Sequence, residues 1–262
     1  MTPILELKNI HYSYHTLDGE TKALSDISFS LAKGEFTAVV GPSGCGKSTL
    51  LSLIDGLFRP ESGELLLGGE SLTENSEKIG YMLQHDHLFE WRTIYRNILL
   101  GAEITGRLTP EIKQRASRML EQYGLKQFAR SKPSELSGGM RQRAALIRTL
   151  LLEPELLLLD EPFSALDYQT RLTVSDDIGQ IIRRTGKTAL LVTHDLSEAV
   201  SLSDRVIVLT KRPATIARIV PITFSIENDT PLNRRNAPEF KTYFNELWKE
   251  LNHDEQTNEG TP

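Results

Sequence analysis

The sequence predicts an α/β fold with a largely parallel, doubly wound sheet. Short apolar runs such as 156–159 and 188–193 alternate with helical segments, which is the pattern of parallel strands covered on both faces. The 262 residues are 39% hydrophobic and 25% charged, as in an ordinary globular protein. We therefore expect one large domain, or two small ones, built around such a sheet.

The N-terminal part is expected to be antiparallel. Strands are predicted at 4–10, 24–31 and 63–67, the last being followed by two glycines and a polar return, as in a hairpin. These strands lie too close together in the sequence for helical crossovers between them. The segment 36–40 is a short apolar strand that leads directly into a glycine-rich turn, followed by an apolar helical segment at 49–57.

The middle of the chain, from Thr109 to about Leu152, has a helical pattern. Thr109 is the expected N-cap of a first helix, with Pro110 in the first helical position, and Gly124 ends that helix. A second helix is expected to start at Ser137.

Strands and helices alternate in the rest of the chain. The predicted elements are buried strands at 156–159, 188–193 and 205–210, and a long helix from Asp167 to Gly186. Apolar residues at helical spacing predict an amphipathic helix from Pro238 to Leu251, packed on the body of the chain. Residues 252–262 are polar, include no core residue, and are predicted to be disordered.

Composition argues against several classes of protein. The net charge is −5, so the chain lacks the basic surplus of a dedicated nucleic-acid binder, and we expect no nucleic-acid partner. No apolar run approaches the roughly 18 residues of a membrane span. The N-terminal residues lack the pattern of a signal peptide, and the single cysteine, Cys45, cannot form an internal disulfide. These features favour an intracellular protein.

The strongest motif is a phosphate-binding loop, G-x-x-x-x-G-K-[ST], which starts at Gly41 and ends at Ser48. Its glycines let backbone N–H groups surround phosphate oxygens, and the helix that follows adds its positive N-terminal end. Lys47 can reach the β and γ phosphates, and the Ser48 hydroxyl can ligate Mg²⁺. Beside a helix N-terminus, the thiolate of Cys45 is expected to be favoured. The predicted nucleotide-binding residues are Gly41, Pro42, Ser43, Gly44, Cys45, Gly46, Lys47, Ser48 and Thr49.

Two carboxylates follow the buried strand 156–159. Asp160 ends a strand of a parallel sheet, so it should lie near the phosphate loop, where it can hold Mg²⁺ or its water shell. Glu161 can then orient or deprotonate a water that attacks the γ phosphate. Without the phosphate loop, an ordinary acidic strand end would be the better interpretation.

His194 follows the predicted strand 188–193, and Gln84 closes the segment 79–83. His194 can contact the γ phosphate, and Gln84 can contact Mg²⁺ or the attacking water. Taken singly, each residue could equally have a structural role.

A clearer signal comes from Ser137, Gly138 and Gly139, which start a helix and predict a second anion site. Since one nucleotide does not obviously need two such sites in one domain, the second could serve a nucleotide held by another subunit.

Together these motifs resemble the ATP-binding cassette (ABC) ATPases, in the order and spacing of that family. The matching segments are 41–48, Gln84, 136–142, 156–161, 164–167 and 193–195. The resemblance implies a P-loop NTPase cassette with a RecA-like core, an antiparallel β subdomain and a helical subdomain inserted at about 87–156. The ABC domain would span 1–230, and 231–262 would hold the C-terminal helix and tail. Two cassettes would pair head to tail around two ATP molecules.

The resemblance also implies roles for individual residues. Tyr14 matches the aromatic residue that stacks on adenine, with Tyr12 as the weaker alternative. Lys47, Ser48 and Thr49 match the phosphate and Mg²⁺ contacts, Asp160 the Mg²⁺ carboxylate, Glu161 the catalytic base and His194 the γ-phosphate sensor. Gln84 matches the residue that links the site to a transmembrane partner. Ser137, Gly138 and Gly139 match the loop that binds the partner subunit's nucleotide, and Asp167 matches the interface loop.

Two details are similar to importers of nitrate, alkanesulfonates and taurine, namely Met140 and the segment 91–93, although Glu90 departs from the usual proline. The implied protein is the ATPase of a bacterial importer, held on the cytoplasmic face of the membrane by an integral-membrane permease and supplied by a solute-binding protein. A homodimer is the simplest assembly, and a heterodimer with a similar chain is the alternative. Trp91 is expected either to anchor the permease or to pack among the helices. The alternatives are an ABC ATPase acting on ribosomes or DNA, and a scaffold that binds ATP without turnover.

Overall fold

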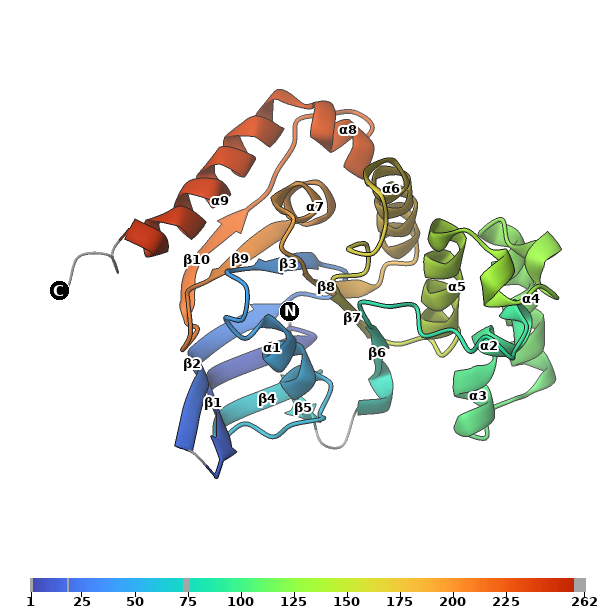
Figure 1. The fold of residues 1–262 in the computed structure, drawn as a ribbon, viewed down its shortest axis with the longest axis horizontal. Helices are drawn as coiled ribbons and strands as arrows, with labels where there is room; N and C mark the ends of the chain where they lie inside the picture. The colour runs from blue at the N-terminus through green and yellow to red at the C-terminus, as the bar shows by residue number, and fades with distance from the viewer. Residues whose placement is uncertain (1, 18, 73–75, 257–262) are drawn as a thin grey trace.

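The computed structural model describes residues 2–17, 19–72 and 76–256 (Figure 1). The strands are β1 (Leu5–Thr16), β2 (Gly19–Leu31), β3 (Phe36–Val40), β4 (Ser62–Leu67), β5 (Glu70–Ser71), β6 (Ile79–Met82), β7 (Leu156–Asp160), β8 (Thr188–Val192), β9 (Arg205–Leu209) and β10 (Ile216–Pro221). The α-helices are α1 (Lys47–Ile54), α2 (Ile94–Ile98), α3 (Leu100–Ile104), α4 (Pro110–Gln122), α5 (Gly138–Leu150), α6 (Tyr168–Arg184), α7 (Leu196–Leu202), α8 (Pro231–Asn236) and α9 (Pro238–Gln256).

The described strands form two sheets, as the sequence predicts. The larger has six strands in the order β10-β9-β3-β8-β7-β6, all parallel except for β10 at one edge. The smaller is antiparallel, in the order β2-β1-β4-β5. Because β3, β8 and β7 are neighbours, the segments that follow them emerge side by side at one edge of the larger sheet.

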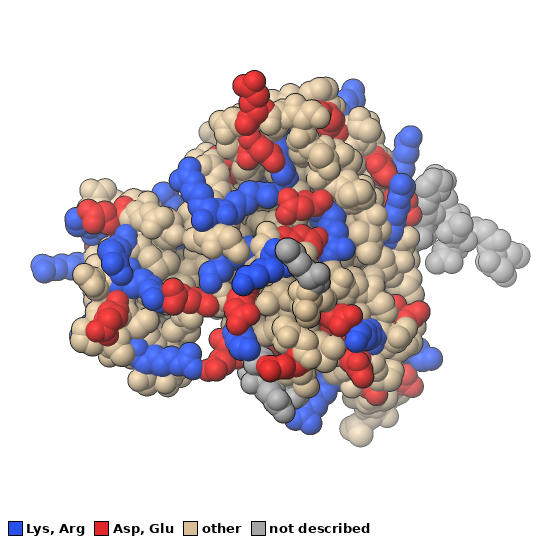
Figure 2. Space-filling view, turned by 180° about the vertical axis from the view of Figure 1, so that it is seen from behind, with Lys and Arg blue, Asp and Glu red and all other residues tan. Residues whose placement is uncertain are grey.

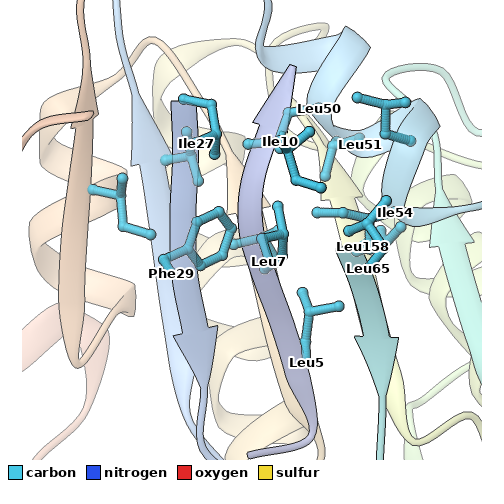
Figure 3. Packing of buried hydrophobic residues seen from close by; sticks show 14 of the residues in the cluster. Leu5, Leu7, Ile10, Ile27, Phe29, Leu50, Leu51, Ile54, Leu65 and Leu158 are labelled. Atoms are coloured by element: carbon cyan, nitrogen blue, oxygen red, sulfur yellow. The ribbon is translucent and has the colours of Figure 1, made fainter. Parts of the chain in front are cut away.

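A shared apolar core joins the two sheets. Figure 3 shows side chains of β1 and β2, such as Leu7 and Phe29, facing Leu50 and Ile54 of α1 and Leu158 of β7. Each of these side chains is buried, and burial of such a residue typically contributes about 1.5–3 kcal/mol. Since α1 continues directly from the glycine-rich turn, this core also fixes the position of that turn.

Two further clusters lie on the helical side of the molecule. One packs α6, α7 and α9 on the other face of the larger sheet, and a separate one unites α2, α4 and α5 beyond its β6 edge (Figure 1). Helix α5 belongs to both, because Ala145 and Leu146 face the sheet while Ala144 and Ile147 face α2 and α4.

Several elements differ from the predicted ones. β1 and β2 are longer, because backbone pairing continues through polar residues, as between His15 and Glu20. β10, α2, α3, α7 and α8 were not predicted, since each is short or partly exposed and has weak periodicity. Helix α9 extends to Gln256, so the prediction of disorder is wrong for 252–256, and 257–262 lie outside the described residues.

The surface carries both signs of charge. In Figure 2, acidic and basic side chains are interspersed over the face shown, without a field of one sign. Within the described part of the chain, no helix combines the length and the apolar character that crossing a bilayer requires.

Candidate nucleotide-binding site

The glycine-rich turn between β3 and α1 wraps around the side chain of Lys47. The Lys47 ammonium donates to the carbonyl oxygens of Gly41, at 2.8 Å, and Pro42, at 2.9 Å. Gly46 begins the helix with φ of +126°, and a Cβ there would lie 2.9 Å from a methyl carbon of Leu24. The backbone conformation therefore favours glycine at position 46, and a side chain there would also require the Leu24 methyl group to move.

A cavity of about 560 Å³ opens above this turn. Its lining residues come from the turn, from the ends of β7 and β8, and from the β9–β10 connection. They are Ser43, Gly44, Gly46, Lys47, Ser48, Thr49, Glu161, His194 and Arg212. The structure thus brings Glu161 and His194 to the phosphate loop, as the sequence predicts, and adds Arg212, for which the sequence gives no local signal.

Glu161 is held in a strained turn. Its φ is +43°, in the left-handed region that non-glycine residues rarely adopt. Its backbone N–H donates to the carbonyl oxygen of Val192 at 2.8 Å, and its carbonyl oxygen accepts from the Ser164 hydroxyl at 3.0 Å. Its carboxylate lies 3.0 Å from Nδ1 of His194. Strain of this kind is often found where a side chain is aimed at a reaction.

Asp160 lies beside this turn, at the end of β7. The Tyr81 hydroxyl donates to its carboxylate at 3.2 Å, and the Ser48 side chain also hydrogen-bonds to it. Burial raises the pKa of Asp160, while these two hydrogen bonds and the Lys47 charge act in the opposite direction. Tyr81 was not among the predicted site residues, because an isolated tyrosine within a short strand has no distinguishing pattern.

Gln84 and Tyr14 lie near the cavity but are not among its lining residues. The Gln84 amide donates to the Ser164 hydroxyl at 3.3 Å, which connects it to the Glu161 turn. The Tyr14 hydroxyl lies 2.9 Å from the Thr49 hydroxyl. Tyr12 contacts the Tyr14 ring edge-on and stacks on Phe58.

The segment around Ser137 lies apart from the cavity. The exposed Ser137 hydroxyl accepts from the Met140 N–H and caps α5, and Asp167 caps α6 in the same way. A Cβ at Gly139 would lie 2.6 Å from a methyl carbon of Val174, so this glycine also permits α5 to pack on α6. Ser137, Gly138, Gly139 and Asp167 do not line the cavity of their own chain.

Cys45 contradicts one expectation. Its side chain is only 1% exposed, and burial raises the pKa of the thiol, although the Lys47 charge and local hydrogen bonds oppose this effect. The thiolate is therefore disfavoured. The expectation of an activated thiol considered the helix N-terminus alone, whereas the side chain points into the core.

A phosphate loop facing a glutamate–histidine pair at the carboxyl edge of a parallel sheet defines a P-loop nucleotide hydrolase. Comparison with known proteins narrows this class. A family profile described as "ABC transporter" matches residues 24–164, and the chain belongs to this family. This confirms the resemblance inferred from the motifs, and the protein is an ABC ATPase.

Its relatives include proteins of several bacteria. It is 45% identical to the "Uncharacterized ABC transporter ATP-binding protein YtlC" of Bacillus subtilis, over 95% of both chains. It is 40% identical to the "Nitrate import ATP-binding protein NrtD" of Synechocystis sp., over 93% of both. It is 39% identical to the "Aliphatic sulfonates import ATP-binding protein SsuB" of Bacillus cereus, over 85% of this chain and 86% of that one.

A solved structure confirms the cassette fold. It is described as the dimeric post-hydrolysis state of the ATP-binding cassette MJ0796, bound to ADP and Pi. The TM-score is 0.68 at 31% sequence identity, and the match covers 82% of this chain and 99% of the other.

Proposed function

We propose that this ABC ATPase drives a bacterial importer of a small solute of the nitrate or sulfonate type, through ATP-dependent closure of two cassettes on a separate permease. The observation that carries the proposal is the exposure of Ser137 away from the cavity of its own chain. An exposed helix N-terminus can be contacted by a second molecule, so it suits a phosphate held by a second cassette. The import functions in the names of the NrtD and SsuB relatives support an importer, and the dimeric cassette structure supports the pairing of two cassettes.

The residues in and near the cavity are assigned roles within this proposal. Tyr14 would stack on adenine, while the phosphate loop and Lys47 hold the phosphates. Glu161 would orient or deprotonate the attacking water, and His194 would contact the γ phosphate while it holds the Glu161 carboxylate in place.

A Mg²⁺ ion fits the donor atoms that meet here. Ser48 and Asp160 offer oxygens, already in contact with each other, and Gln84 offers an amide oxygen near the same turn. In nucleotide sites, Mg²⁺ usually takes its remaining ligands from phosphates and water. When bound, Mg²⁺ would neutralise phosphate charge.

The division of the chain belongs to the same proposal. The ABC domain would span 1–230, with a helical subdomain inserted at about 87–156 and a C-terminal segment from 231. The separate apolar cluster formed by α2, α4 and α5 supports this insertion.

A mixing experiment tests the paired site. Lys47→Ala breaks the phosphate loop, and Ser137→Arg places bulk and charge at the partner's site. Each variant alone should lose hydrolysis. A mixture forms heterodimers in which both defects fall in one composite site and the other site is intact, so part of the activity should return. Full activity of Ser137→Arg alone would contradict the paired site.

The permease contact is proposed at the loop before α2. Trp91 is 72% exposed and lies against Phe89, with ring centroids 4.6 Å apart, so it does not pack among the helices. Such an exposed aromatic pair suits an anchor for a protein partner. Trp91→Ala should release the protein from membranes that contain the permease and leave its ATPase activity in solution unchanged.

Trp248→Ala is the matched control, since Trp248 is 56% exposed on α9. It should leave membrane attachment intact. A pull-down of the full chain from detergent-solubilised membranes should recover a multi-span partner. Recovery of ribosomes or DNA instead would favour an ABC ATPase acting in a non-transport complex.

A further inference from the structure

The connection between β9 and β10 is fixed against the phosphate loop. Ala214, in this connection, is buried and pairs with β2: its N–H donates to the Ala23 carbonyl, and its carbonyl accepts from the Ser25 N–H, both at 2.9 Å. The turn is closed on its other side by hydrogen bonds between Thr210 and Thr215. The backbone at Arg212 is thus anchored from two directions.

The side chain of Arg212 reaches the phosphate loop from this anchored turn. Its guanidinium donates to the carbonyl oxygen of Gly44 at 2.7 Å, and it lines the same cavity as Glu161 and His194. No carboxylate among the described residues forms an ion pair with Arg212. A guanidinium has five N–H donors in a planar fork, so donors remain for a further acceptor.

Lys47 offers an instructive comparison within the same cavity. Lys47 and Arg212 are its two Lys or Arg side chains, and both donate to backbone carbonyls of the same loop, Lys47 at the first two residues and Arg212 at the fourth. A neutral carbonyl is a weaker partner for a cation than a phosphate oxygen, and the arginine fork matches phosphate geometry particularly well.

We infer that Arg212 is a second cationic contact for the phosphates of the nucleotide bound to its own chain, besides Lys47. The inference rests on the proposed nucleotide site and adds a residue from outside the motifs that define it. The alternative is that Arg212 only braces the loop through Gly44, without touching the nucleotide.

Binding of MgADP and MgATP, measured by calorimetry as a function of salt, separates the two roles. Arg212→Gln should weaken both nucleotides about five- to twentyfold, the range expected for one charge-assisted hydrogen bond at a partly exposed site. The affinity of the variant should also fall less steeply with added KCl, because one cation–phosphate contact is gone. Arg212→Lys keeps the charge, so its affinity for both nucleotides should lie between that of Arg212→Gln and that of the unmodified protein.

The neighbouring Lys211 supplies the control, because it is exposed and does not line the cavity. Lys211→Gln removes the same charge and should leave both affinities within about twofold. The inference is overturned if Arg212→Gln matches Lys211→Gln, or if its affinity falls while the salt dependence stays that of the unmodified protein, as a brace alone would give. If the unmodified protein binds neither nucleotide, the proposed function fails first.

Discussion

Nδ1 of His194 lies 3.0 Å from a carboxylate oxygen of Glu161, although the two residues follow different strands, β8 and β7. Both residues line the cavity above the phosphate loop. Their contact means that a change in either side chain alters the placement of the other, so variants at these two positions should not be additive.

Replacement of Glu161 by Gln tests its proposed role. The amide keeps the shape and much of the hydrogen bonding but cannot act as a base, so hydrolysis should fall about 10²- to 10⁴-fold. Binding through Lys47 and Ser48 should persist. With MgATP, size-exclusion chromatography should therefore show an accumulated dimer that contains uncleaved ATP. Adding Ser137→Arg should abolish that dimer, and a dimer that persists in the double variant would argue against the paired site.

Glu198 should make stability depend on pH. It is 2% exposed, accepts from the Thr193 hydroxyl at 2.7 Å, and burial raises its pKa from 4.5 to about 7. Asp195 adds to this rise, while Arg171 and Arg235 oppose it. The folded state therefore binds this proton more tightly than the unfolded state does, so this carboxyl lowers stability as pH rises from about 4.5 to about 7.

Glu198→Gln removes this titration. Between pH 4.5 and 8, urea unfolding should show the variant gaining up to about 3 kcal/mol relative to the unmodified protein. A difference between the two proteins that stays constant with pH would contradict the raised pKa.

Cys45 should react slowly with maleimide. Its burial and raised pKa both reduce the reactive thiolate, so alkylation of the folded protein should be at least about tenfold slower than that of the urea-unfolded chain. The rates can be followed by mass spectrometry. Rapid modification of the folded protein would show an exposed, activated thiol instead.

Asn97 should hold the loop that carries Trp91. This fully buried amide accepts from the Phe89 N–H at 2.7 Å and donates to the carbonyls of Phe89, Arg92 and Thr93. Asn97→Ala leaves several of these groups unpaired and should cost about 2–3 kcal/mol in urea unfolding. It should also weaken membrane attachment, as is expected of Trp91→Ala. Unchanged stability would contradict this role.

The parts of the site that depend on motif spacing or on strand order could be predicted from the sequence. The phosphate loop has a fixed spacing. Arg212, Tyr81 and Asn97 could not be predicted in this way. Their partners, Gly44, Asp160 and the loop before α2, are fixed only by tertiary packing.

The two wrong predictions, at Cys45 and at the end of α9, have the same cause: they rested on local sequence features and did not include tertiary packing. At Cys45 a local effect, the helix N-terminus, was outweighed by burial that depends on the whole core. At the end of α9 the polar composition of 252–256 suggested disorder, but the helix continues through these residues from the packed part before them.

The left-handed backbone of Glu161 has a consequence for how this chain tolerates change. A non-glycine residue in that conformation costs about 1–2 kcal/mol, and glycine does not pay it. Selection for thermal stability alone would therefore favour Gly at position 161. The resulting protein would be more stable but would lack the carboxylate. If Glu161 acts as the base proposed above, glycine here would stabilise the fold but abolish hydrolysis, so stability and activity favour different residues at position 161.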